Sequence, residues 1–252
     1  MLKKLSVLLG ISAVFTMFAA GETAAKLDYA TLTVPTLKPV GSGNMKNSVV
    51  HYVLRNQQVL FFCLKDGESI NLYVKHFGNK SRPTGISYVI LDQQKNELKK
   101  GVISYSTLER IVHKVEKGGT YAMVISSGTL AAPWYTVSSK TPFTALSAAG
   151  KEIYLFGPQS IFVPGKALGN NNMQVRIGPK ESYTAVIDGG EKQSVTTAGS
   201  KLLDMPDKAV VKVVFGNLPK PAWGQNFHIS FPGNDRTPFI FYGPERAVEI
   251  VK

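Results

Sequence analysis

The sequence predicts an all-β protein in which two antiparallel β-sandwich, jelly-roll-like domains follow an N-terminal signal peptide. The 252 residues, 44% of them hydrophobic, suffice for one or two packed domains. After the N-terminus, short apolar runs alternate with turns made of Gly, Pro, Asn and Asp. Strands at this spacing are typical of an antiparallel sandwich.

Residues 1–25 are expected to form the signal peptide. Lys3 and Lys4 precede an uncharged apolar stretch, and small residues follow, so that cleavage is expected after Gly21 or Ala25. The apolar stretch is shorter than the roughly 20 residues that a membrane-spanning helix needs. We therefore expect an exported protein, periplasmic or extracellular, with no transmembrane segment once the signal has been removed.

The first domain is expected over residues 26–130. The stretch VLFFCLKDGESINLYVKHF, residues 59–77, predicts a hairpin: an apolar central strand, a turn at Asp66-Gly67, then a strand of period two. The turn chemistry favours an Asx-type hydrogen bond of Asp66 to its own backbone. The strands expected in this domain are residues 30–34, 51–54, 59–64, 69–77, 85–91, 100–105, 110–115 and 120–126.

For one of these segments the sequence also allows a helix. Leu108, Ile111, Val112 and Val115 fit a helical i, i+3, i+4, i+7 stripe. A Gly-Gly turn and an apolar run follow at once, so we predict a strand over residues 110–115.

Residues 48–128 carry the phrases DGESINLYV, YVILDQQKNEL and KGGTYAMVISSG. They resemble the bacterial pre-peptidase C-terminal (PPC) domain and related secreted jelly-roll modules. In that family a Gly, Tyr and Val strand closes a small sandwich, and Gly119, Tyr121 and Val124 take those places. Asp92 matches a hairpin aspartate, whereas Asn96 replaces the usual glycine. The resemblance implies a non-catalytic appendage of an exported enzyme.

Residues 131–149, AAPWYTVSSKTPFTALSAA, are expected to be a linker because they are small, polar and interrupted by proline. The second domain is expected over residues 150–252. The phrases IFVPGK and AVIDGGEK, the latter a hairpin, give it a loose resemblance to accessory β-sandwich modules of secreted bacterial proteins. Its expected strands are residues 152–156, 160–163, 173–177, 183–188, 210–215, 227–231 and 238–241.

The net charge indicates which classes of partner are expected. The formal net charge of +12 favours anionic partners such as acidic polysaccharide or cell-envelope material. Nucleic acid is not expected, because no basic-aromatic signature is present.

The single cysteine, Cys63, has apolar neighbours and is expected to be a buried hydrophobe rather than a nucleophile.

No catalytic, metal or cofactor motif is recognisable, so we expect no enzyme activity. The nucleophile-elbow and β-lactamase patterns are missing from the sequence, and Asp204 and Asp207 are expected to belong to a turn. None of the histidines has metal-ligand spacing; they are His51, His76, His113 and His228.

The candidate binding residues are Trp134, Tyr135 and Trp223, because exposed aromatic rings can stack on sugars. The alternative is that Trp134 packs between the domains and Trp223 closes one end of the second sandwich. We thus predict an exported, non-catalytic binding or accessory protein for glycan or envelope material. The alternatives are a cell-surface structural or assembly protein and, less favoured, a hydrolase with dispersed catalytic residues.

Overall fold

A computed structural model of the chain describes residues 23–40, 50–77, 84–128, 134–139, 144–147, 153–154, 159–166, 172–178, 182–195, 199–216, 228–232, 239–241 and 247–251. The regular elements of these residues are strands and contain no α-helix, which confirms the all-β prediction. Residues 1–22 of the expected signal peptide, and Trp223, lie outside the described residues.

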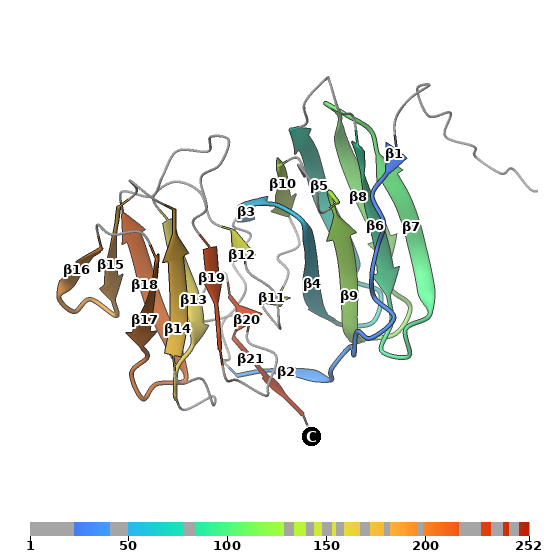
Figure 1. Ribbon diagram of the computed structural model, residues 1–252. Coiled ribbons are helices and arrows are strands. Elements are labelled where there is room, and N and C mark those ends of the chain that lie inside the picture. Colours follow the sequence, from blue (N-terminus) through green and yellow to red (C-terminus); the bar gives the residue numbers. More distant parts are fainter. Residues whose placement is uncertain are drawn as a thin grey trace, which may run out of the picture.

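Two sheets face each other in the first half of the chain (Figure 1). The large sheet has the order β6 (Thr84–Leu91), β9 (Gly119–Ser126), β4 (Gln57–Leu64), β11 (Ala145–Ser147) and β20 (Phe239–Ile240), with β1 (Thr23–Ala24) and β7 (Glu97–Ile103) both paired to β6. The second sheet, called the β5 sheet, has the order β3 (Val50–Leu54), β10 (Trp134–Ser139), β5 (Ser69–Phe77) and β8 (Leu108–Lys114). Side chains such as Phe62, Leu72 and Ile111 are fully buried in the core.

A second pair of sheets lies beside the first (Figure 1). One has the order β12 (Ile153–Tyr154), β19 (His228–Ser230), β14 (Asn172–Ile177) and β17 (Gly199–Asp204). The other has the order β13 (Gln159–Pro164), β18 (Val210–Gly216), β15 (Tyr183–Ile187) and β16 (Lys192–Val195). The rings of Tyr183 on β15 and Phe215 on β18 are buried and pack edge to face, with their centroids 6.2 Å apart.

The predicted hairpin over residues 59–77 is wrong, although both strands exist. β4 pairs with β9 and β11, and β5 pairs with β8 and β10, so the intervening turn carries the chain from one sheet to the other. Gly67 does adopt a positive φ of 75°. The Asp66 carboxylate, however, accepts a hydrogen bond from the Gly118 N–H at 2.6 Å, which ties this turn to the neighbouring one.

Two other predicted hairpins and one predicted strand are present, and one predicted strand is not. β6 and β7 form a hairpin in which the Asp92 carboxylate accepts hydrogen bonds from the backbone and side-chain nitrogens of Asn96 at 2.8 and 2.7 Å. β15 and β16 form the expected second hairpin. β8 is a strand, since Ile111 is buried while Leu108 and Val112 are exposed. The strand expected at residues 30–34 is wrong: Val34 is buried, but this segment has no strand, and pairing begins at β2 (Leu37–Pro39).

The segment expected as a linker contributes two strands. β10 lies between β3 and β5, and β11 lies between β4 and β20. β20 itself comes from the second half of the chain. Phe241 and Phe162 then exchange backbone hydrogen bonds at 3.3 and 2.6 Å, which links the large sheet to β13. Backbone pairing therefore connects the two halves, while the domain boundaries remain a prediction.

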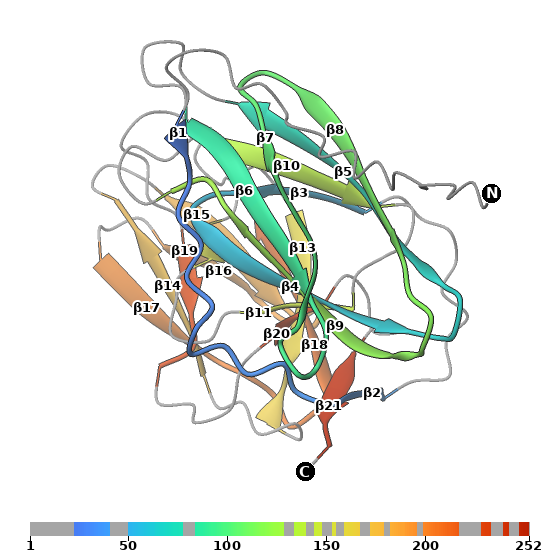
Figure 2. The same ribbon diagram turned by 90° about the vertical axis from the view of Figure 1, so that its right-hand side faces the viewer.

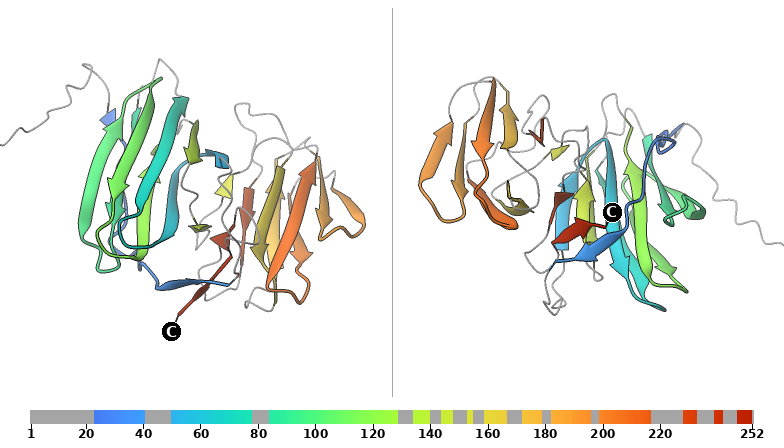
Figure 3. Two further views of the ribbon diagram at one scale, coloured as in Figure 1. Left: turned by 180° about the vertical axis from the view of Figure 1, so that it is seen from behind. Right: turned by 90° about the horizontal axis from the view of Figure 1, so that it is seen from below.

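Residues 25–40, called the strap, run along the outer face of the large sheet (Figure 2). Val34 and Leu37 of the strap pack in an apolar cluster with Phe61 and Val124. The strap ends in β2, which pairs with β21 (Val248–Ile250) near the C-terminus (Figure 3). The large sheet thus buries apolar side chains on both of its faces.

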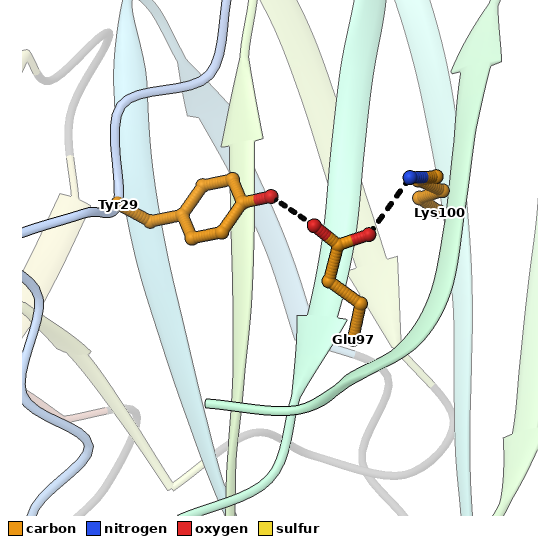
Figure 4. Close-up of polar contacts among 3 residues, drawn as sticks. All are labelled: Tyr29, Glu97 and Lys100. Atoms are coloured by element: carbon orange, nitrogen blue, oxygen red, sulfur yellow. Dashed lines mark hydrogen bonds and ion pairs between the residues drawn. The ribbon is translucent and has the colours of Figure 1, made fainter. Parts of the chain in front are cut away.

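Polar contacts anchor the strap to the β6–β7 hairpin. The Tyr29 hydroxyl donates to one oxygen of Glu97, and the other oxygen pairs with Lys100 at 2.8 Å (Figure 4). The Lys95 ammonium donates to the Ala30 carbonyl at 3.1 Å. These groups are exposed, so they fix the path of the strap more than they stabilise the fold.

The buried position of β11 gives a direct test of whether residues 131–149 belong to the core. Leu146 is fully buried, so Leu146→Ala should lower the free energy of unfolding by about 2–5 kcal/mol. Leu202→Ala is the control, because Leu202 is 54% exposed, and it should stay within about 0.5 kcal/mol of wild type. Urea denaturation measures both. Two near-neutral variants would contradict the structure and favour a free linker.

Candidate functional site: an aromatic and cationic sheet face

The β5 sheet has one buried face and one face in solvent. Along β5, Ile70, Leu72, Val74 and His76 are buried, whereas Lys75 and Phe77 are exposed. This alternation follows from the period of two of a strand. The solvent face, called the β5 face, can be traced in the view from behind (Figure 3). Its outward residues on β5, β8 and β10 include Asn71, Tyr73, Lys75, Phe77, Leu108, Arg110, Val112, Lys114 and Trp134.

Cationic groups lie over the aromatic rings of this face. The Arg110 guanidinium lies 5.8 Å from the centroid of the Tyr73 ring, and the Lys75 ammonium lies 5.1 Å from that of Phe77. The Arg55 guanidinium, just beyond β3, lies 5.1 Å from the Trp134 ring. A cation over the face of an aromatic ring is attracted by the ring quadrupole and is thereby held in place.

Strand register joins these contacts into one surface. Trp134 pairs directly with Phe77, and Tyr73 pairs directly with Arg110. Lys75 is diagonal to both Trp134 and Arg110, about 7–8 Å away at the backbone. The cations and rings therefore form a continuous band across β10, β5 and β8.

A network of hydrogen bonds holds the turn that presents Arg55. The Asn56 N–H donates to Ser127 Oγ at 3.1 Å, and the Asn56 carbonyl accepts from the Tyr135 hydroxyl at 3.1 Å. The Gln58 side-chain amide donates to the Arg55 carbonyl at 2.9 Å. Asn56 has a φ of 58°, a left-handed conformation that asparagine tolerates well. The guanidinium is thereby held beside Trp134.

The structure separates the candidate residues suggested by the sequence. Trp134 lies half-buried on the β5 face. Tyr135 points the other way, is fully buried, and has its pKa raised well above the ordinary value by that burial. It supports the turn below Arg55 and is not available to a surface ligand. Trp223 lies outside the described residues.

The band is strongly biased in charge. The outward-facing residues described on these strands, together with Arg55, include four cations, Arg55, Lys75, Arg110 and Lys114, and no carboxylate. Phe77, Leu108 and Val112 add apolar area, being 46%, 64% and 39% exposed. The β5 face therefore combines positive charge with exposed apolar area.

The described part of the chain contains no group of three or more His, Cys, Asp and Glu side chains that could hold a metal ion. His76 and His228 are buried in different sandwiches. The described residues also include no helix able to cross a membrane.

The sequence reasoning missed Tyr73, Phe77 and Arg110. A signal was present, because Asn71, Tyr73, Lys75 and Phe77 alternate with apolar residues along β5. The alternation predicts the strand, and its outward half is the set of residues that forms the surface.

Comparison with known proteins assigns no family. No protein-family model matches this chain, and no curated protein matches it. A structural match links it to the M60 catalytic domain with the CBM51-1 and CBM51-2 domains of Clostridium perfringens ZmpB, at 10% identity and a TM-score of 0.27. The match covers 81% of this chain and 38% of the other. A TM-score this low does not establish a common fold.

Cys63 is placed as a structural residue rather than as a nucleophile. It lies under the strap, its thiol donates to the Leu37 carbonyl at 3.6 Å, and burial raises the pKa of the thiol. Only the thiolate reacts, and unfolding removes the burial that raises the thiol pKa, so alkylation of the folded protein at pH 8 should be slower than in urea. Mass spectrometry of a labelling time course measures this. Equal rates would show that the strap leaves Cys63 open.

Proposed function

We propose that this protein is a non-catalytic binding protein for acidic polysaccharide, and that the β5 face is its binding surface. The observation that supports this best is the set of cations that lie over Trp134, Phe77 and Tyr73 with no carboxylate among the outward residues described there. Cations held by rings lose little side-chain freedom on binding, which favours affinity. The exposed apolar residues beside them suit the C–H faces of sugar rings.

The shape of the surface favours an extended ligand. A sheet face spanning four strands is shallow, whereas small molecules are bound mostly in concave pockets. Assembly through strand edges is less favoured, because the Lys99 ammonium donates to the Val112 carbonyl at 2.9 Å and so covers part of the free edge of β8. The resemblance of residues 48–128 to the PPC domain agrees with an accessory binding role.

The polysaccharide proposal is tested by removing cations from the band. The double variant Lys75→Ala/Arg110→Ala should weaken binding to polygalacturonate by about tenfold or more, because two charged contacts are lost. Lys192→Ala/Lys212→Ala is the matched control, since it removes the same charge from exposed positions on β16 and β18. Calorimetry at two salt concentrations measures affinity, which should fall as salt rises.

Two results would contradict the proposal. Failure of the wild-type protein to bind polygalacturonate or any other acidic polysaccharide would exclude acidic polysaccharide as its ligand. An equal loss in both double variants would show that net charge alone, rather than the β5 face, is responsible.

We also propose that the chain is exported and that signal cleavage follows Gly21 rather than Ala25. Residues 23–24 pair with β6, the Ala25 N–H donates to the Gly85 carbonyl at 3.1 Å, and the Ala25 side chain is 7% exposed. Cleavage after Ala25 would remove these contacts. Ala19 and Gly21 also supply the two small residues that signal peptidase reads.

Intact-mass measurement of protein secreted from a bacterial host tests the cleavage site. We expect a mature chain that begins at Glu22. A chain that begins at Lys26 would contradict the preferred site, and retention of Met1 would contradict export by a cleaved signal.

A further inference from the structure

We infer that the acidic group recognised on the β5 face is a carboxylate, as in a polyuronate chain, and that Arg110 is the residue that selects it. This inference rests on the proposed polysaccharide-binding function. It deepens that function by naming the chemistry of the ligand.

The surroundings of Arg110 fix one edge and one face of its guanidinium. The Nε–H donates to Asn71 Oδ1 at 3.0 Å, and the Tyr73 ring lies 5.8 Å from the guanidinium carbon. Tyr73 is the direct cross-strand partner of Arg110, and Asn71 is diagonal to it. Both neighbours come from the centrally paired strand β5, so the hydrogen bond and the ring together restrict the orientation of the guanidinium.

The part of the Arg110 guanidinium that is left to contact a ligand is its outer edge. Within the described part of the chain, the terminal nitrogens of Arg110 have no acceptor at hydrogen-bond distance. Two parallel N–H groups on that edge match two coplanar oxygens of one acidic group. A lysine at the same position would offer only a point charge without a preferred plane.

The edge can bind two oxygens of a carboxylate, a sulfate ester or a phosphate, so its geometry alone does not choose between them. A uronate carboxylate is joined directly to the sugar ring, whereas a sulfate or phosphate ester is joined through an oxygen and turns more freely. An edge restrained by side chains of β5 therefore contributes most to carboxylate binding, and the flanking residues add to this choice. Leu108 and Val112 lie about 7 Å from Arg110 on either side along β8 and are 64% and 39% exposed. In a uronic acid the carboxylate is attached directly to the sugar ring, which would then cover these apolar side chains.

The positions of the other cations on the β5 face suit a polymer that carries an acidic group on each repeating unit. Lys75 is diagonal to Arg110 at about 7–8 Å, and Lys114 lies four residues along β8, about 14 Å away. Only a chain with many carboxylates could reach several of these positions together. Affinity should therefore increase with the length of the uronate chain.

The test compares wild type with Arg110→Lys, which keeps the charge but removes the planar edge. The ligands are polygalacturonate, its fully methyl-esterified form, dextran sulfate and a polyglycerol phosphate. We expect the wild type to prefer polygalacturonate and to lose most binding to the ester. Arg110→Lys should weaken polygalacturonate binding about tenfold and leave binding to dextran sulfate unchanged.

Two further variants make the result specific. Asn71→Ala should weaken polygalacturonate binding less than Arg110→Lys, because it frees the guanidinium without removing it. Lys212→Arg, at an exposed position on β18 outside the band, is the matched control and should not change binding. Thermal melting of every variant checks that the fold is intact, and all substituted side chains point outward from their sheets.

The outcomes separate the inference from the function on which it rests. Tighter binding of dextran sulfate or polyglycerol phosphate, or an equal effect of Arg110→Lys on all acidic polymers, would overturn the carboxylate inference alone. Failure of the wild type to bind any acidic polymer would overturn both.

Discussion

The large sheet must be covered on both faces, and the rest of the architecture follows from that requirement. Along β4, Leu60 and Phe62 point into the sandwich, while Phe61 points outward and is only 1% exposed. A strand that is apolar on both faces is stable only when both faces are packed. The strap from the N-terminal region and β21 from the C-terminal region supply the outer cover. The outer side of the β5 sheet mixes cationic, aromatic and apolar side chains, and no described segment of the chain packs over it as the strap packs over the large sheet.

Periodicity located most strands because it reflects which residues are buried, but it carries no information about which strands pair. This is why residues 59–77 gave two correct strands and a wrong hairpin. The segment that contains β10 was mistaken for a linker because its composition is small and polar. Its inward residues, Tyr135, Val137 and Ser139, nonetheless alternate as a buried strand requires. Pairing across such sequence distances depends on the whole fold.

The site shows the same division between local and long-range information. Trp134 was recognisable as a candidate because it is an aromatic residue in a polar context. Its neighbours on the surface are Phe77 on β5 and Arg55 in the turn after β3, which are distant in sequence and meet it only in the folded chain. Tyr135 was grouped with Trp134 because the two are adjacent in sequence, yet adjacent residues of a strand face opposite sides. Lysines and arginines that look dispersed along the chain are likewise gathered by alternate positions on neighbouring strands.

The backbone bridge between Phe162 and Phe241 has a mechanical consequence. Its two hydrogen bonds tie the large sheet to β13, so the halves of the chain are joined at this point by backbone pairing. Sliding one half past the other would break both bonds at once, so the bridge resists shear between the two halves.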